Sequence, residues 1–229
     1  MQNQSSLNFV FINGRNGAGK DTQANILLEG LPNTIKISTG DVYRDARDGQ
    51  GKYGKYKEQI APWVTHVESG GLIPDEVILP IVGEIIGTEF ENGIRNFIFT
   101  GFPRTIPQLG NLDRYLDDLS QKYDVKTRFI ALAVLENTSR ARAENRYREA
   151  LASGQIPRAD DVPEVVERRF STYQNLIGPM LHKLADEKRL IVIKSNGGIE
   201  DVRARLHKEI AEGKSTNREL WHNSSKERE

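Results

Sequence analysis

Short apolar runs recur along the chain, and patterns of helical period separate them. A short apolar run bounded by turn signals is typical of a buried strand. Strands that alternate with helices predict an α/β fold, a doubly wound parallel sheet covered by helices on both faces. The expected strands are Asn8–Ile12, Thr34–Ile37, Asn96–Thr100, Arg128–Val134 and Leu190–Ile193.

Two regions hold more helix than a single crossover needs. Between the second and third strands, the segment 40–88 is interrupted by glycines and prolines, which predicts a small lobe at about 39–73. Later, helical patterns at roughly 137–152 and 162–186 flank Ser153–Pro157, which resembles the tip of a lid spanning about 146–158. We expect one domain over residues 1–212, followed by a polar, frayed tail at 213–229.

The amino-acid composition limits which kinds of binding partner are expected. Lys and Arg number 32 and so do Asp and Glu, so no net field favours nucleic acid or a membrane surface. The longest apolar run, Phe129–Leu135, is far too short to cross a bilayer, and the N-terminus lacks the features of a signal peptide. Without cysteine there is no thiolate zinc site and no disulfide. We expect a cytoplasmic, soluble monomer that acts on small molecules.

A glycine-rich stretch, Gly14–Gln23 (GRNGAGKDTQ), follows the first strand and opens a helix. It fits the phosphate-binding pattern G-x-x-x-x-G-K-[ST], except that Asp21 takes the hydroxyl position and Thr22 follows it. Such a loop turns backbone N–H groups toward an anion, while Lys20 reaches the outer phosphates and Thr22 offers a hydroxyl to Mg²⁺. A ligand-free turn is disfavoured by the flanking strand and helix. The loop alone does not separate a kinase from a GTPase or a motor.

Arginines follow this loop at positions suited to phosphate. Arg44 and Arg104 lie near expected strand ends, and Arg142, Arg146, Arg158 and Arg169 lie around the expected lid. Any one of them, taken alone, is an ordinary surface residue. Their order after a phosphate loop favours phosphoryl transfer, which needs cations around the moving group and exclusion of water.

These motifs together carry a resemblance. The chain resembles the nucleoside monophosphate kinases, and within them the adenylate kinases. The segments that carry the resemblance are, in order, GRNGAGKDTQ (14–23), STGDVYR (38–44), LIPDE (72–76), GFPRTIPQ (101–108), RAENR (142–146), RADD (158–161) and VVERRF (165–170). The resemblance runs from about Phe9 to Leu206. It implies a five-stranded P-loop fold and Mg²⁺-dependent transfer of a phosphoryl group from ATP to a nucleoside monophosphate.

The resemblance also implies residue roles. The expected catalytic residues are Lys20, Arg104, Arg146, Arg158 and Arg169, and Thr22 is expected to hold Mg²⁺ partly through water. The expected ATP site comprises Gly14, Asn16, Gly17, Ala18, Gly19, Lys20, Asp21, Thr22, Arg142 and Gly197, and the expected acceptor site comprises Thr39, Arg44, Gly101, Arg104, Gln108, Arg158 and Arg169. Asp160 and Asp161 match the acidic pair of the lid. The attacking phosphate oxygen is already anionic, so His66, His182 and His207 are interpreted as structural or surface residues.

Acceptor choice is predicted from two positions. Gln108 presents the paired donor and acceptor that an adenine edge requires, and Thr39 stands where adenylate kinases carry a base-contacting threonine. AMP is therefore the expected acceptor, giving ATP + AMP ⇌ 2 ADP. Only eleven residues separate Arg146 from Arg158, so the resemblance implies a lid of the short type, which has no room for the extra strands of long-lid members and no cysteines for their zinc site.

Several departures from the family pattern keep alternatives open. Thr100 stands where an Asp usually precedes Gly-Phe-Pro-Arg, and Asp21 replaces a glycine beside the phosphates. Asp21 either repels the donor or replaces the missing metal-side charge, in which case Asp21→Gly weakens Mg²⁺-dependent turnover. Lys194-Ser195 replaces a common Asp-Gly pair, and the acceptor lobe is longer than usual around 53–69. The alternatives are a kinase for UMP, CMP or a deoxynucleotide, and a catalytically weakened nucleotide-binding protein; a nucleic-acid role is the weakest.

Overall fold

A computed structural model describes residues 6–158 and 161–212, and its scaffold is a parallel sheet. The five strands lie in the order β2-β3-β1-β4-β5, which confirms the predicted α/β fold. Their bounds are β1 (Ser6–Gly14), β2 (Thr34–Ser38), β3 (Asn96–Thr100), β4 (Asp124–Ala133) and β5 (Leu190–Lys194).

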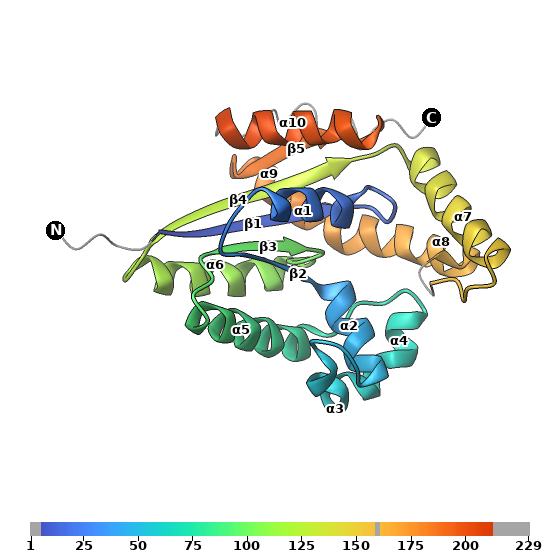
Figure 1. Ribbon diagram of the computed structural model, residues 1–229, viewed down its shortest axis with the longest axis horizontal. Helices are drawn as coiled ribbons and strands as arrows, with labels where there is room; N and C mark the ends of the chain where they lie inside the picture. The colour runs from blue at the N-terminus through green and yellow to red at the C-terminus, as the bar shows by residue number, and fades with distance from the viewer. Residues whose placement is uncertain (1–5, 159–160, 213–229) are drawn as a thin grey trace.

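Helices cover both faces of this sheet (Figure 1). One face packs against α1 and α10, and the other packs against α5, α6 and α9. The helices are α1 (Lys20–Glu29), α2 (Thr39–Asp48), α3 (Lys57–Ile60), α4 (Val64–Glu68), α5 (Asp75–Glu91), α6 (Ile106–Ser120), α7 (Glu136–Ala152), α8 (Pro163–Thr172), α9 (Gly178–Asp186) and α10 (Ile199–Glu212), with the short 3₁₀ turns η1 (Gly54–Tyr56) and η2 (Ala61–Trp63).

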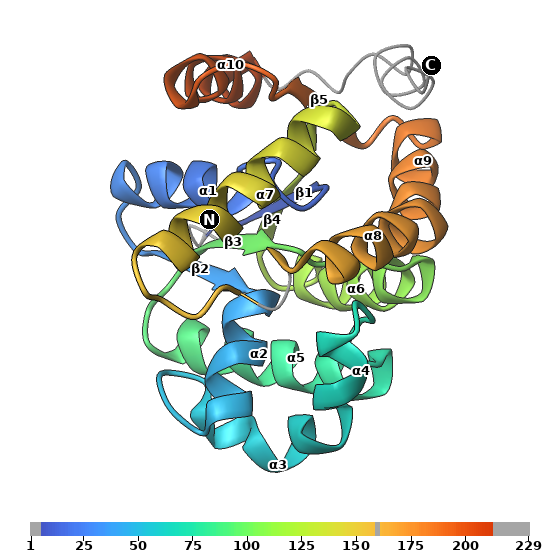
Figure 2. The same cartoon turned by 90° about the vertical axis from the view of Figure 1, so that its right-hand side faces the viewer.

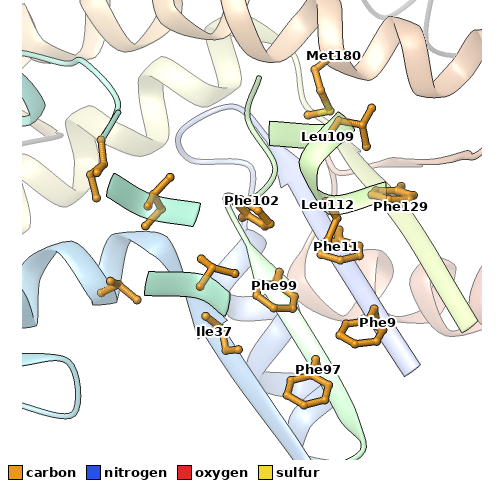
Figure 3. Close-up of a cluster of buried hydrophobic side chains, with 14 of the residues drawn as sticks. Phe9, Phe11, Ile37, Phe97, Phe99, Phe102, Leu109, Leu112, Phe129 and Met180 are labelled. Carbon is orange, nitrogen blue, oxygen red and sulfur yellow. The ribbon is translucent and has the colours of Figure 1, made fainter. Parts of the chain in front are cut away.

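Stacked phenylalanines hold the three central strands together on the α6 face (Figure 3). The strand register places Phe9 opposite Phe97, and Phe11 opposite both Phe99 and Phe129. The ring centroids of these pairs lie 5.1, 5.0 and 4.9 Å apart. Aromatic pairs at such distances contribute about 0.5–1.5 kcal/mol each beyond their burial. The stacking therefore holds β1, β3 and β4 in place relative to one another, and the ends of β1 and β3 carry predicted site residues.

The segment between β2 and α5 forms several short helices on the side of the sheet away from α10 (Figure 2). The breaks follow from backbone chemistry. Helix α2 ends at Gly49, whose φ of 67° is left-handed, and α5 begins directly after Pro74. Residues 39–73 thus hold α2, α3 and α4, and their role as an acceptor-binding lobe stays a prediction.

Several strand boundaries differ from the sequence-based expectation by one or two residues, and two larger differences occur at the start of β4 and within the helix expected at 162–186. Strand β4 begins at Asp124, four residues before Arg128, because its polar first residues pair with the start of β1 while their side chains lie near solvent. The helix expected at 162–186 contains a π-helical turn, η4 (Tyr173–Ile177), in which the Gly178 N–H bonds to the Tyr173 carbonyl. Pro179 has no N–H to continue the regular ladder, which explains the wider turn.

Within the described ranges, no helix is long and apolar enough to cross a membrane. Asp160 and the polar tail at 213–229 lie outside the described residues.

Candidate active site

The glycine-rich loop connects the end of β1 to the start of α1. Gly17 and Gly19 have φ values of 77° and 88°, a left-handed conformation that other residues adopt at a cost. A Cβ on Gly17 would lie 2.9 Å from the Ser139 carbonyl oxygen, so there is also no space for a side chain. The loop therefore keeps its backbone N–H groups at the positive end of α1, where an anion binds favourably.

Two neighbouring elements hold this loop in place. The Lys20 ammonium donates to the carbonyl oxygens of Gly14 at 3.1 Å and Arg15 at 2.9 Å. From α7, the Ser139 hydroxyl donates to the Asn16 carbonyl, and Arg142 Nη1 donates to the Gly17 carbonyl at 3.0 Å. The loop is thus fixed mainly through its main chain.

Arg142 also reaches the segment after β5. Its Nη2 donates to the carbonyl oxygens of Ser195 at 3.0 Å and Gly197 at 3.3 Å. The structure therefore brings the predicted donor residues Arg142 and Gly197 together beside the loop, although they are 55 positions apart.

Asp21 and Thr100 form a contact between α1 and the end of β3. The Thr100 hydroxyl donates to Asp21 Oδ1 at 2.7 Å, and Thr100 is buried. Burial acts to raise the pKa of Asp21, but the Thr100 hydrogen bond and the nearby charges of Lys20, Lys36 and Arg44 outweigh it and lower that pKa below its ordinary value. A carboxylate thus lies among cations in the cavity that Thr22 also lines.

On the acceptor side, the loop after β3 is tied to the start of α2. The Thr39 hydroxyl donates to the Gly101 carbonyl at 2.9 Å and accepts from Arg104 Nη2 at 3.2 Å. Arg104 Nε donates to the same Gly101 carbonyl at 2.6 Å. Three predicted acceptor residues are therefore in direct contact.

Gln108 is held by Asp75, the first residue of α5. Its Nε2 donates to Asp75 Oδ1 at 2.6 Å, and its Oε1 accepts from the Arg104 backbone N–H at 2.7 Å. Thr105, which caps α6, donates its hydroxyl to Asp75 Oδ2 at 2.9 Å. Asp75 thus orients Gln108, a role that we did not predict because the contact joins residues 33 positions apart.

The remaining predicted arginines approach from three elements. Arg44 pairs with Asp41 within α2, and Arg146 of α7 makes two hydrogen bonds with the buried carboxylate of Asp161. Arg169 of α8 donates to the Val67 carbonyl at 3.3 Å and so contacts the end of α4. Arg158 lies on the exposed segment after α7.

Two adjoining cavities contain most of these residues. A cavity of about 560 Å³ is lined by the phosphate loop, Asp21, Thr22, Thr100 and Arg146. A second, of about 530 Å³, is lined by Thr39, Gln108 and residues of α2, α4 and α5. Seven residues line both cavities, and they include the arginines Arg44, Arg104, Arg158 and Arg169. Of all the predicted site residues, the linings omit Ala18, Arg142 and Gly197.

Comparison with known proteins gives the family. A family model described as Adenylate kinase matches residues 12–188, more than half of the chain. The chain belongs to the adenylate kinase family. An adenylate kinase of Nitrobacter hamburgensis is 34% identical to it over 201 residues, which cover 87% of this chain and 90% of that protein. An adenylate kinase of Rhizobium meliloti is 34% identical over 207 residues, which cover 90% of this chain and 100% of that protein. The predicted class, a nucleoside monophosphate kinase and hence a phosphotransferase, is confirmed.

Some lining residues of this adenylate kinase family member were not predicted. Tyr43 lines the second cavity one helical turn after Thr39, a spacing that offered a signal. Burial and the nearby Glu68 carboxylate raise the pKa of Tyr43 to about 12, so it stays protonated. Glu68 accepts from Arg47 Nη1 at 3.2 Å, and both line the same cavity. No local motif marks these two residues.

The donor atoms beside the phosphate loop fit magnesium. Mg²⁺ prefers oxygen ligands and is usually bound through one or two carboxylates together with substrate phosphates and waters. Thr22 and Asp21 supply a hydroxyl and a carboxylate on the same cavity wall. Within the described part of the chain, no group of three or more acidic or histidine side chains gathers as a metal cluster.

Proposed function

We propose that this chain catalyses ATP + AMP ⇌ 2 ADP with Mg²⁺. The observation that carries the proposal is the set of four arginines that line both cavities. A phosphoryl group that moves from one nucleotide to another must pass between their binding sites, and cations at that boundary stabilise its charge throughout the transfer.

Each side of the boundary has its own task. The loop residues from Gly14 to Thr22 hold the donor phosphates, and Lys20, the first residue of α1, neutralises their charge. Arg44 and Arg104 hold the acceptor phosphate, while Arg146, Arg158 and Arg169 surround the transferred group. Thr22 would hold Mg²⁺ partly through water, and the metal would further neutralise the phosphate charge. The acceptor oxygen is anionic, so no side chain has to remove a proton.

AMP is the proposed acceptor because of the way Gln108 is held. Asp75 and the Arg104 N–H fix its amide in one orientation, yet Nε2 retains a second hydrogen and Oε1 a second lone pair. An adenine edge offers the matching acceptor and donor. Thr39 lies on the same wall. A uracil edge also offers an acceptor and a donor, O4 and N3–H, so the proposed preference for AMP over UMP rests on the size of the base and on Thr39 as well.

Closure of two segments completes the proposed site. The acceptor lobe (39–73) and the lid (146–158) border the cavities, and Ile156 at the lid tip lines the acceptor cavity with 95% of its surface exposed. An apolar side chain in this position gains burial when the lid closes over bound nucleotide. Closure keeps water away from the phosphoryl group. The proposed unit is a monomer with a single domain at 1–212 that uses neither zinc nor nucleic acid.

The test is a coupled assay of ADP formation from ATP and Mg²⁺ with AMP, CMP, UMP, GMP and dTMP in parallel. We expect turnover with AMP, reduced about 10²- to 10³-fold in Lys20→Ala and unchanged in Lys122→Ala, an exposed control. Faster turnover with another monophosphate would refute the role of Gln108 and Thr39 in choosing the base. Binding of ATP without turnover of any acceptor would favour the weakened, nucleotide-binding alternative.

A further inference from the structure

Asp21 is an unusual residue for a wall that binds phosphate. It is the second residue of α1, and it lines the donor cavity beside Lys20 and Thr22. A carboxylate at this position repels the anionic ligand that the rest of the loop attracts. The repulsion is removed where a cation binds between the carboxylate and the phosphates.

Thr100 fixes this carboxylate from the far side. Thr100 ends β3, where it is paired with Ile12 of β1 and Ser38 of β2, so its backbone lies in the centre of the sheet. Only 2% of Thr100 is exposed, and its hydroxyl donates to Asp21 Oδ1 at 2.7 Å. The carboxylate is therefore held by a rigid element. Among the residues that the structure describes, the other oxygen, Oδ2, has no hydrogen-bond partner.

An oxygen held in this way suits the water shell of a hydrated cation. Mg²⁺ in phosphate sites keeps several waters, and carboxylates bind these waters through hydrogen bonds. Thr22 follows Asp21 directly, its side chain is exposed, and it lines the same cavity. A hydroxyl and a carboxylate, both oxygen donors that suit Mg²⁺, thus come from successive residues of one cavity lining.

We propose that Asp21, oriented by Thr100, binds the water shell of the magnesium ion that accompanies ATP and makes nucleotide binding depend on that metal. The inference rests on the proposed function, because it assumes ATP as the donor. In this arrangement Asp21 penalises metal-free ATP and favours the magnesium complex, and Thr100 is a positioning residue. A simpler role for Asp21 is to complement the positive end of α1, which would contribute to stability alone.

The experiment measures how much Mg²⁺ strengthens binding of a non-hydrolysable ATP analogue. Calorimetric titration of the full chain with this analogue, in Mg²⁺ and in EDTA, gives the ratio of the two dissociation constants. For Asp21→Asn we expect that ratio to fall about 10- to 100-fold, the usual effect of removing a partner of a metal's bound waters. Part of the fall in this ratio should come from tighter binding of the analogue in EDTA, where the variant no longer repels the metal-free phosphates. Glu29→Gln, at the other end of α1, should leave the ratio unchanged.

Variants at Thr100 test the positioning role. Thr100→Val, which removes the hydroxyl, should lower the ratio, while Thr100→Ser, which keeps it, should restore the wild-type value. The double variant Asp21→Gly/Thr100→Asp should regain the metal preference that Asp21→Gly loses, because it returns a carboxylate to the same cavity wall from the strand end.

The outcomes separate this inference from the proposed function. A wild-type ratio in Asp21→Asn, together with a lower melting temperature, would assign Asp21 to helix stability and overturn the inference while ADP formation from ATP and AMP still stood. Failure of the wild-type chain to bind the analogue in Mg²⁺ would overturn both.

Discussion

The donor and acceptor cavities are built from different kinds of contact. On the donor side, Lys20 and Arg142 bond to main-chain carbonyls, and glycine conformations shape the loop. On the acceptor side, Thr39 and Arg104 also bond to the Gly101 carbonyl, but Gln108 is held by a side-chain pair with Asp75, which bonds to Thr105 as well. The phosphate loop therefore depends mainly on where the backbone is, whereas Gln108 depends on a particular side-chain pair. Substitutions on one side should therefore change binding of one nucleotide much more than binding of the other.

The largest effect is expected at a residue that belongs to both sides. Arg104 lines both cavities, and its guanidinium lies at their boundary. Arg104→Ala should lower kcat about 10²- to 10³-fold, because a charge that stabilises the transferred group is lost, and should raise KM for AMP. Steady-state kinetics with each substrate varied measure this. Arg114→Ala, an exposed change on α6, is the control. A normal kcat in Arg104→Ala would remove this arginine from the transfer step.

The next effect isolates the acceptor side. Asp75→Ala leaves the Gln108 amide and the Thr105 hydroxyl without their partner, which costs about 1–3 kcal/mol. KM for AMP should therefore rise about tenfold or more, while KM for ATP stays within about twofold. Asp117→Ala, an exposed change on α6, should alter neither constant. Equal rises in both Michaelis constants would show that the two cavities do not depend on separate contacts.

A smaller effect isolates the donor side. Gly17→Ala places a side chain at a φ of 77° and 2.9 Å from the Ser139 carbonyl, so it should weaken ATP binding and cost about 1–3 kcal/mol of unfolding free energy. Gly83→Ala in α5 meets nothing within 4 Å and should stabilise the chain by about 0.5–1 kcal/mol. Urea unfolding and ATP titration measure both. Stabilisation by Gly17→Ala would contradict the described loop geometry.

The smallest effect tests whether side chains also hold the donor loop. The Arg15 guanidinium lies 5.2 Å from the centroid of the Tyr173 ring and 3.7 Å from Glu136 Oε2, and Arg15 is only 8% exposed. Arg15→Gln should lower the unfolding free energy by about 0.5–2 kcal/mol and the melting temperature by a few degrees, as calorimetry would measure. Arg203→Gln, on the exposed side of α10, is the control. An unchanged melting temperature would mean that the main-chain contacts hold the loop by themselves.

The same contrast explains what could be predicted from the sequence. Strand runs, glycine spacing and the position of Lys20 are local patterns, so the sheet and the phosphate loop were predicted and the fold is confirmed. The contact of Thr100 with Asp21 spans 79 positions, and that of Asp75 with Gln108 spans 33, so neither is visible in a local pattern. The π-helical turn before Pro179 was missed because the apolar period does not distinguish a π turn from an α turn, although Pro179 itself was a local signal.

The phosphate and base contacts of individual residues were predicted from the family resemblance. The structure brings four of the six predicted arginines to the boundary of the two cavities, but which of them contacts which phosphate stays a prediction. Arg142 is bonded to backbone carbonyls and lines neither cavity, so its predicted place in the ATP site requires another orientation of its side chain or a nucleotide that binds against its outer face.

The most direct measurement of the central claim, that two nucleotides bind at once across the shared arginines, uses a bisubstrate compound. Two adenosines joined through five phosphates span a donor and an acceptor site in one molecule. Calorimetric titration with this compound should show one molecule bound per chain, far more tightly than ATP, and in competition with both ATP and AMP. A compound that binds no more tightly than ATP, or that competes with only one of the two nucleotides, would contradict the account.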